Sequence, residues 1–442
     1  MEKDPSAINT IHRLILQGAT VSIDSRTIEK GSVFFALKGE NFDANHFAAG
    51  AIKKGAAIAV VDNKDIEPHE QFVFVEDVLQ ALQDVASQHR DLFKIPVIGI
   101  TGSNGKTTTK EILHAVLSRK FNTLCTKGNF NNHIGVPLTL LNLTKEHQVA
   151  IIEMGANHIG EIAMLSSLAK PTSGLITNIG KAHIEGFGSV ENIVIAKTEL
   201  YKYLQANNGL IFLNADNEIL SKQVNISSCI TYGKGASSRY TGDIVASSPF
   251  LEISFISKQS KTQSEKHWHI RTQLTGRYNF ENIMAATAIG LHMGVLPEQI
   301  KEAIENYTPV NSRSQWKETG KNALIMDAYN ANPTSMKAAL DNFNHIETTQ
   351  PKALILGDML ELGITAEAEH QEIIQFLSRH TYNFVLLVGS EFSKIRTLPS
   401  NYNVFPDTKT AAGWLENHAP ENHTILLKGS RGIGLEQLEC FL

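Results

Sequence analysis

The sequence predicts an α/β protein of three domains, with mostly parallel sheets in the two larger ones. Short apolar runs alternate along the chain with helix-like stretches, the pattern of a parallel sheet covered by helices on both faces. The chain has 442 residues, about three times the length of a typical domain. Polar motifs follow directly after several apolar runs, at the edge where open α/β sheets bind ligands.

The first predicted domain covers residues 1–93 and is a small α/β unit. Apolar clusters and a helical stretch alternate over 33–61, and a strand is predicted at 72–75. A helix rich in Ala, Leu and Gln follows over 78–92. Pro96 then stops helical geometry, because proline disfavours it in the preceding residue.

The second predicted domain covers residues 94–310 and is organised as a phosphate-loop (P-loop) type domain. It begins with a buried strand at 97–101, a glycine loop and a helix over 106–120. Further strands are predicted at 149–154, 174–178 and 209–214, an exposed hairpin loop at 257–266, and a closing helix over 282–292. The alternation of strands and helices predicts a mostly parallel sheet.

The third predicted domain covers residues 311–442 and repeats this pattern as a Rossmann-like unit. Its strands are predicted at 323–327, 353–356, 384–388 and 424–427. Six polar motifs follow strands in the second and third domains: TGSNGKTT, EMGA, TNIG, DAYN, LGDM and KGSR. We expect them to meet at the carboxyl edges of the two sheets.

Composition excludes several classes of protein. A net charge of -5 argues against nucleic acid as the main partner. Cys125, Cys229 and Cys440 are far apart, which suggests neither a disulfide framework nor a zinc site. The apolar runs are much shorter than the roughly 20 residues of a membrane span, and the N-terminus does not look like a secretory signal. We therefore expect a cytoplasmic location.

The segment GITGSNGKTTTK predicts a nucleotide site. Its backbone N–H groups and the start of the following helix can surround a phosphate, while Lys106 reaches the terminal phosphates and Thr107 a magnesium ion. Position 100 is isoleucine where the common phosphate-loop pattern has glycine, so a structural turn is the alternative. A guanine-reading Asn-Lys-x-Asp element is missing after the loop, which disfavours a GTPase. The expected ATP-binding residues of the loop are Gly102, Ser103, Asn104, Gly105, Lys106, Thr107 and Thr108.

Three further residues could take part in metal binding. Glu153 ends a predicted strand and directs a carboxylate, a good magnesium ligand, toward the edge that carries the loop. His183 and Lys197 follow in TNIGKAHIEGFGS and AKTEL. A surface histidine and a solvated lysine are the alternatives, and position in the chain does not decide between them.

Several motifs in register resemble the Mur ligase family of peptidoglycan precursor synthesis. They are GITGSNGKTT, EMGA, TNIGKAHIEGFGS, AKTEL, GRYNFENIMAA and DAYNANP. The segment DSRTIEKGSVFFALKGENFDANHF resembles the family's N-terminal UDP-binding domain. NFNNHIGVP, YNANP, LGDMLELG and KGSRG are more similar to the branch that adds a dipeptide.

The resemblance implies an ATP- and Mg²⁺-dependent ligase that joins D-alanyl-D-alanine to UDP-N-acetylmuramoyl-tripeptide. The implied reaction passes through an acyl phosphate and serves cell wall synthesis, and thereby cell shape, cell division and the cell cycle. A sister ligase that adds a single amino acid, or a folylpolyglutamate synthetase, is the alternative within the family. A nucleotide-binding regulatory module without catalysis is the alternative outside it. We expect a monomer whose third domain closes onto ATP bound by the second.

The resemblance also implies roles for individual residues. Thr107 and Glu153 would bind one magnesium ion, and His183 and a carbamylated Lys197 a second one. The implied catalytic residues are Lys106, His183, Lys197 and Arg313.

The remaining implied residues contact nucleotide or substrate. Asn282 would contact adenine, Arg313 the γ-phosphate and Asp327 the ribose, with Tyr329 and Asn330 in the same loop; a helix cap, a linker arginine and turn chemistry are the alternatives. The expected substrate contacts are Ser25 and Arg26 for the uridine diphosphate, Asn131 and Asn132 for the muramoyl peptide, and Lys428 and Arg431 for the dipeptide carboxylate. For these, surface or loop-shaping roles are the alternatives.

Overall fold

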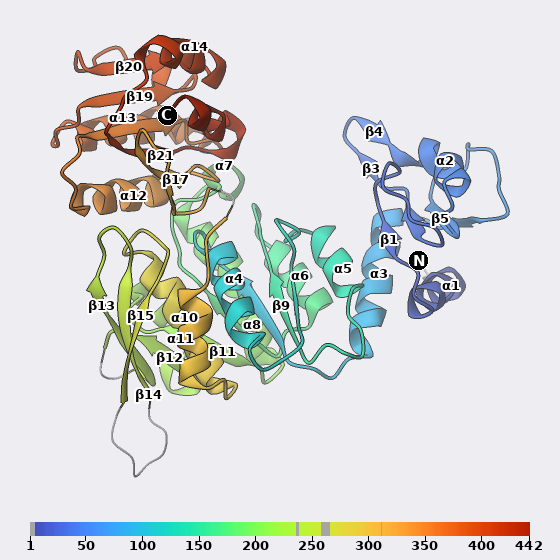
Figure 1. Cartoon of the computed structure of the whole chain (residues 1–442). Coiled ribbons are helices and arrows are strands. Elements are labelled where there is room, and N and C mark those ends of the chain that lie inside the picture. The colour runs from blue at the N-terminus through green and yellow to red at the C-terminus, as the bar shows by residue number, and fades with distance from the viewer. Residues whose placement is uncertain (1–4, 236–237, 258–265, 311) are drawn as a thin grey trace.

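The computed structural model describes residues 5–235, 238–257, 266–310 and 312–442. Figure 1 shows three successive α/β units, from the N-terminal one in blue to the C-terminal one in red. Each contains a sheet whose strands are mainly parallel, which confirms the predicted fold class. None of the helices in this part of the chain has both the length and the apolar character needed to cross a membrane.

The N-terminal unit contains a four-stranded parallel sheet of order β1-β2-β5-β6. Its elements are α1 (Pro5–Leu16), β1 (Val21–Ser22), β2 (Val33–Phe35), β3 (Lys38–Gly39), β4 (Phe42–Asp43), α2 (Ala48–Lys53), β5 (Ile58–Val61), β6 (Phe72–Phe74) and α3 (Val78–Asp91). Helix α3 begins at the cap Asp77, whose side chain accepts a hydrogen bond from the Gln80 backbone N–H. It packs against α1 on one side and against α5 and α6 of the next unit on the other.

The central unit contains a nine-stranded sheet of order β15-β14-β13-β12-β11-β10-β7-β9-β8. Its strands are β7 (Val97–Thr101), β8 (Thr123–Cys125), β9 (Val149–Glu153), β10 (Ser173–Ile176), β11 (Leu210–Asn214), β12 (Ile230–Gly233), β13 (Tyr240–Ala246), β14 (Glu252–Ser257) and β15 (Lys266–Arg271). Its helices are α4 (Lys106–Leu117), α5 (Gly135–Leu140), α6 (Glu161–Ala169), α7 (Ile184–Phe187), α8 (Val190–Ala206), α9 (Glu218–Ser221), α10 (Asn279–His292) and α11 (Pro297–Glu305).

Both faces of this sheet are covered, as the apolar strands predict. Along β9, Ala150 and Ile152 belong to one hydrophobic core, while Val149 and Ile151 belong to another. Successive side chains of a strand point to opposite faces, so a strand with core on both sides must be apolar throughout. The carboxyl edge is then the place where polar residues can begin.

The C-terminal unit contains a six-stranded sheet of order β16-β17-β21-β18-β19-β20, parallel except for β16. Its elements are β16 (Gln315–Glu318), β17 (Ala323–Asp327), α12 (Pro333–His345), β18 (Lys352–Gly357), α13 (Ala366–Leu377), β19 (Phe384–Val388), β20 (Tyr402–Phe405), α14 (Thr408–His418) and β21 (Thr424–Lys428). The four strands predicted here are present, within one residue at each end.

The structure adds an antiparallel extension that the sequence analysis did not predict as strands. β13 pairs with β14 and β14 with β15, both antiparallel, at one end of the central sheet. The predicted hairpin loop falls mostly on residues 258–265, which lie outside the described residues. The domain boundaries near residues 93 and 310 stay predictions.

Candidate active site

The loop after β7 depends on glycine at two positions. Gly102 has φ +144°, and a Cβ there would lie 2.0 Å from Thr177 Oγ1. Gly105 caps α4 with φ +80°, and a Cβ there would lie 2.4 Å from Asn282 Oδ1. Both the backbone conformation and the close neighbours therefore exclude a side chain at these two positions. The loop needs glycine at 102 and 105, and isoleucine at position 100 does not affect this requirement.

The TNIG segment after β10 holds this loop in place. Ser103 Oγ donates to Gly180 O at 3.0 Å and accepts from Gly180 N at 2.9 Å. Asn104 N donates to Asn178 Oδ1 at 3.0 Å. The loop and the second polar motif therefore form one rigid edge of the sheet.

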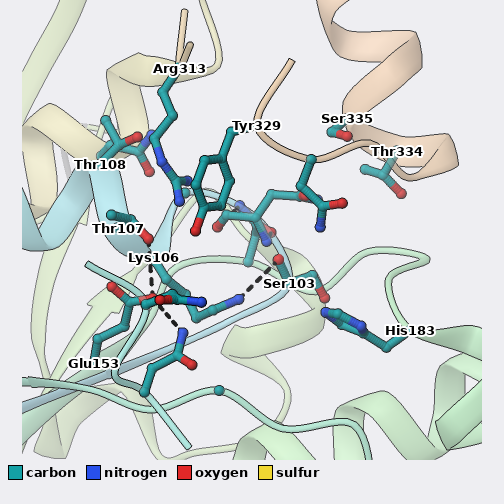
Figure 2. A pocket seen from close by; sticks show the side chains of 18 of the residues that line it. Ser103, Lys106, Thr107, Thr108, Glu153, His183, Arg313, Tyr329, Thr334 and Ser335 are labelled. Atoms are coloured by element: carbon teal, nitrogen blue, oxygen red, sulfur yellow. Dashed lines mark hydrogen bonds between the residues drawn. The ribbon is translucent and has the colours of Figure 1, made fainter. Parts of the chain in front are cut away.

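Lys106 folds back over this loop. Its ammonium donates to Gly102 O at 2.7 Å and to Ser103 O at 3.2 Å. Burial lowers the pKa of Lys106, an effect that Glu153 opposes and Arg313 strengthens. Figure 2 shows Lys106 between Glu153 and His183, so the loop lies between the two predicted metal-binding positions.

Glu153 is the centre of a buried polar cluster. Its side chain is 1% exposed. Its Oε1 accepts hydrogen bonds from Thr107 Oγ1 at 3.1 Å and from Asn131 Nδ2 at 2.8 Å. Its Oε2 lies 3.4 Å from Lys110 Nζ. The predicted pair Thr107 and Glu153 is thus in direct contact although 46 residues separate them.

His183 lies at the other side of the cavity. It adopts a left-handed backbone conformation with φ +54° and caps the short helix α7. Its Nδ1 contacts a carboxylate oxygen of Glu361, which comes from the LGDMLELG loop of the C-terminal unit and is itself left-handed at φ +63°. Two strained residues from different domains therefore meet at this side of the cavity.

Lys197 is buried beneath the same region. It is 1% exposed, donates to Ala156 O at 3.1 Å and lies over the ring of Phe187. Burial, and to a lesser extent the charge of Lys106, hold the pKa of Lys197 well below its ordinary value. Burial therefore favours the neutral amine at this position.

Arg313 lies on the segment that joins the central and C-terminal units. Its neighbours Ser312 and Ser314 have left-handed backbones, with φ +53° and +50°. The guanidinium lies 3.5 Å from the centre of the Tyr329 ring. In the described part of the chain its buried Nε has no hydrogen-bond partner, which leaves a donor for an anion.

Asp327 and Lys428 end the adjacent strands β17 and β21. Lys428 Nζ lies 2.8 Å from Asp327 Oδ2, donates to Asn330 O at 3.2 Å, and the side chain is only 3% exposed. The residues predicted to bind the ribose and the dipeptide carboxylate are therefore partners in one ion pair. Arg431 is exposed and its Nη1 lies 3.4 Å from Tyr329 Oη.

The asparagines differ in their surroundings. Asn282 accepts from Thr109 Oγ1 at 3.0 Å and donates to Asn279 Oδ1 at 2.9 Å, so both ends of its amide are engaged. Asn132 Oδ1 accepts from the backbone N–H groups of Ile134 and Gly135. Asn132 thus shapes its loop, the alternative that the sequence left open.

One cavity of about 670 Å³ collects most of these residues. It is lined from the central unit by Ser103, Asn104, Gly105, Lys106, Thr107, Thr108, Asn131, Asn132, Glu153, His183 and Asn282, and from the linker and C-terminal unit by Arg313, Asp327, Tyr329, Asn330 and Lys428. Gly102, Lys197 and Arg431 are outside this lining.

Ser25 and Arg26 lie elsewhere, on the N-terminal unit. Arg26 is exposed and pairs with Asp24 at 2.7 Å, which lowers the pKa of Asp24 to about 2. Ser25 O accepts from Lys54 Nζ at 2.7 Å. The structure therefore does not bring this pair to the cavity that holds the phosphate loop.

Direct contacts join the central and C-terminal units around the cavity. Asn332 Nδ2 donates to Asn104 Oδ1 at 2.7 Å, and Lys181 Nζ pairs with Glu369 at 2.6 Å. Figure 2 shows Thr334 and Ser335, at the start of α12, above the phosphate loop. Thr334 Oγ1 accepts from Lys181 N at 3.0 Å.

The sequence analysis missed Lys110, Glu361 and Tyr278; Tyr278 lines the cavity, with its Oη 2.9 Å from Ser314 Oγ. Lys110 stands one helical turn after Lys106 in TGSNGKTTTK, and this spacing was an available signal. Glu361 and Tyr278 stand inside motifs that were noted only as strings. Their partners come from distant parts of the chain, so no local pattern identified them.

Comparison with known families and structures shows which proteins the chain resembles. Three family models match: "Mur ligase family, catalytic domain" over residues 19–90, "Mur ligase middle domain" over 100–290 and "Mur ligase, glutamate ligase domain" over 312–431. The chain is 35% identical to the UDP-N-acetylmuramoyl-tripeptide--D-alanyl-D-alanine ligase of Bacillus subtilis, over 95% of this chain and 92% of that protein.

Two solved structures are similar over nearly the whole chain. A MurF crystal structure from Acinetobacter baumannii superposes with a TM-score of 0.86 at 30% identity, covering 100% of this chain and 99% of that one. MurF from Thermotoga maritima, solved in complex with ADP, superposes with a TM-score of 0.84 at 25% identity and 97% coverage of both chains. With these matches and the cavity geometry together, the chain belongs to the Mur ligase family.

Proposed function

We propose that this protein is an ATP-dependent ligase that joins D-alanyl-D-alanine to UDP-N-acetylmuramoyl-tripeptide in peptidoglycan precursor synthesis. The observation that carries the proposal is the single cavity where the phosphate loop, Glu153, Arg313 and Asp327 come together. Curated relatives with this name are 31–37% identical over most of the chain, including those of Bacillus subtilis and Escherichia coli.

The chemistry fits two successive transfers. The tripeptide's terminal carboxylate attacks the γ-phosphate of ATP and releases ADP, which forms an acyl phosphate. The amine of the dipeptide then attacks the acyl carbon, inorganic phosphate leaves, and the amine gives up a proton. Such phosphoryl transfer requires mainly placement and compensation of charge. Lys106 supplies positive charge from the central unit, and Arg313 supplies it from the segment that joins the central and C-terminal units.

The residues at Glu153 fit a magnesium ion. Thr107 Oγ1 and Glu153 Oε1, 3.1 Å apart, are both hard oxygen donors. The described residues contain no group of three or more His, Cys, Asp or Glu side chains that could form a cage. This suits Mg²⁺, which takes few protein ligands and completes its shell with phosphate and water. Bound there, magnesium would neutralise charge on the terminal phosphates.

We propose a second cation site at His183 only if Lys197 is carbamylated. The unmodified amine of Lys197 donates to Ala156 O and does not fit a cation ligand. Carbamylation would replace this amine with an anionic oxygen ligand. Intact mass measured in bicarbonate buffer should show an added 44 Da on Lys197 by the chemistry of CO₂ addition; a bare amine in the magnesium-loaded enzyme would contradict it.

The remaining site residues are assigned to the nucleotide and to the two substrates. Asp327 and Tyr329 line the cavity with the loop, which supports nucleotide binding between the two units. Ser25 and Arg26 are proposed for the uridine diphosphate, and Lys428 and Arg431 for the dipeptide. Monomeric state and cytoplasmic location stay predictions; light scattering of the purified chain checks the first.

A substrate-dependence assay tests the function. Phosphate release should require ATP, UDP-muramoyl tripeptide and D-alanyl-D-alanine together, and mass spectrometry should find the ligated pentapeptide. The same assay with single amino acids and with glutamate acceptors tests the alternative activities, those of the sister ligases and of folylpolyglutamate synthetase. Turnover with one of those amines but not with the dipeptide would refute the proposal, and ATP binding without any ligation would favour a regulatory module.

The Lys106→Met variant tests whether the loop performs the chemistry. It keeps the length of the side chain but removes the cation, so kcat should fall by roughly 10²–10³-fold. Circular dichroism and the melting temperature should match those of the wild-type protein. Undiminished kcat would place the chemistry elsewhere.

A further inference from the structure

We infer that Lys110 is a positioning residue for the reaction: it fastens the Glu153 carboxylate and the loop that carries Asn131 to the phosphate-binding helix. The inference rests on the proposed function and deepens it. It concerns a lysine that binds neither nucleotide nor substrate directly, because Lys110 is absent from the described residues lining the cavity.

Lys110 occupies a buried position between three segments. It lies on α4, one turn beyond Lys106, and its side chain is 2% exposed. Its ammonium lies 3.4 Å from Glu153 Oε2 at the end of β9, and it donates to Gly128 O at 3.1 Å. A single cation thus connects the phosphate helix, the metal-binding strand end and the loop after β8.

The two carboxylate oxygens of Glu153 have different partners. Oε2 faces Lys110, whereas Oε1 faces Thr107 and Asn131, at 3.1 and 2.8 Å. Oε1 therefore accepts two hydrogen bonds, while Oε2 has no hydrogen-bond partner among the described residues and has the Lys110 ammonium as its ion-pair partner. Without the ammonium, Oε2 would lose its ion-pair partner, and only the two hydrogen bonds to Oε1 would orient the carboxylate.

The same ammonium anchors the loop that presents Asn131. Gly128 is left-handed at φ +53°, and its carbonyl is directed to Lys110. Further along, Asn131 O accepts from Gly155 N at 2.7 Å. The loop is thus held at two points by residues of the ATP side, so the muramoyl-peptide side of the cavity depends on Lys110 as well.

Burying a lysine costs desolvation free energy, which a purely structural role at this position would not require. A buried ion pair is often no more stabilising than well-packed apolar residues of the same volume. Other residues of α4, namely Ile112, Leu113, Val116 and Leu117, are apolar and belong to the adjoining core, whereas Lys110 faces a carboxylate and a carbonyl. Retaining a charged pair here is understandable if orientation of the carboxylate is what matters.

The experiment compares Lys110→Met and Lys110→Arg with the wild-type full-length protein. Mn²⁺ binding in the presence of ADP is followed by electron paramagnetic resonance, and hydrogen exchange is followed in residues 126–134. Lys202→Met, at an exposed lysine of α8, is the control for loss of one positive charge. ADP binding without metal gives a second reference.

Lys110→Met should weaken Mn²⁺ binding by about ten-fold or more, the usual effect of losing a residue that orients a metal ligand. It should also speed exchange in the loop and raise KM for the UDP-muramoyl tripeptide. Lys110→Arg should recover most of the loss, and Lys202→Met should behave as wild type. If Lys110→Met does not fold, Lys110→Gln, which keeps a donor for Gly128 O, should show the same weakening.

Two results would overturn the inference. Mn²⁺ binding and loop exchange equal to wild type, even with a lower melting temperature, would make Lys110 structural only. Tighter Mn²⁺ binding in Lys110→Met would mean that the ammonium only repels the metal. Failure of the wild-type protein to ligate the dipeptide would refute the proposed function instead, and the Mn²⁺ and exchange measurements would still report on Lys110.

Discussion

The central unit is joined to its two neighbours in different ways. Toward the N-terminal unit it shares one hydrophobic core, which contains Phe35 and Leu82 together with Leu140 and Ile152. Toward the C-terminal unit, in the described part of the chain, no core cluster is shared, because the two C-terminal cores draw only on residues 316–442. Figure 1 shows α3 beside α5 at the first join and the C-terminal unit seated on the other end of the central one.

Polar contacts supplement the first join, and at the second they accompany one aromatic contact between Phe250 and Trp316. At the first, buried Arg90 donates to Ala169 O at 2.9 Å and to Lys170 O at 3.0 Å. At the second, Asn104 meets Asn332 and Lys181 meets Glu369, beside a linker with left-handed serines. Apolar joins resist opening, whereas polar ones exchange readily with water. The C-terminal unit is therefore the part expected to move as ATP and substrate bind.

The largest effect is expected at the linker between the central and C-terminal units. Arg313→Met removes the unpartnered Nε donor beside Tyr329 and should lower kcat by roughly 10²–10³-fold, because charge on the γ-phosphate loses a cationic partner from the linker. Steady-state kinetics measure it. Arg379→Met, at an exposed arginine of the C-terminal unit, is the control, and equal rates for both variants would contradict the role.

A substitution at the join between the N-terminal and central units should change the free energy of unfolding rather than kcat. Arg90→Met leaves buried carbonyls of α6 and its end without their donor, which should lower the free energy of unfolding by about 3 kcal/mol. Thermal unfolding measures the change, with exposed Arg396→Met as reference. A large fall in kcat without a change in melting temperature would show that this join is catalytic rather than structural.

A smaller effect is expected from the ion pair across the polar join. Lys181→Met should raise KM for ATP by roughly 2–5-fold, since a half-exposed pair contributes at most about 1 kcal/mol. Lys337→Met is the control, because Lys337 pairs with Glu372 at the same 2.6 Å within the C-terminal unit and the two lysines are 43% and 41% exposed; the partner carboxylates differ, with Glu369 9% and Glu372 48% exposed. Small-angle scattering with nucleotide and substrate should show compaction, and equal effects of the two variants would argue against a role in closure.

The smallest effect concerns pH at the apolar join. His12 Nε2 lies 3.2 Å from His89 Nδ1, and burial lowers the pKa of both below 6.5. Below about pH 6.5 the two histidines bind protons in the unfolded chain but stay neutral in the folded one. Their contribution to the free energy of unfolding is therefore complete above that pH and is lost on acidification toward the lower folded-state pKa. The loss of melting temperature between pH 7.5 and pH 5.5 should be smaller in His12→Asn, about as much as one histidine contributes; an unchanged slope would exclude the pair as its source.

Much of the fold and part of the site could be predicted from local pattern. The strand at 97–101, the glycine turn and the helix from Lys106 depend on residues adjacent in sequence. Apolar runs also end where polar motifs begin, which located the ligand edge of both sheets. The extension from β13 to β15 was not predicted as strands, because these strands alternate buried and more exposed residues and lack the continuous apolar run of the central strands.

The sequence by itself therefore determined the α/β class, the phosphate loop and the candidate residues at the ends of strands, since these follow from short-range geometry and hydrophobic pattern. Only the tertiary structure decided that Glu153 touches Thr107, that Lys110 faces the same carboxylate, and that Glu361 reaches His183 from another domain. Those pairings depend on how sheets and domains pack. Contacts between residues far apart in the chain leave no local signal, because their partners meet only after the chain has folded.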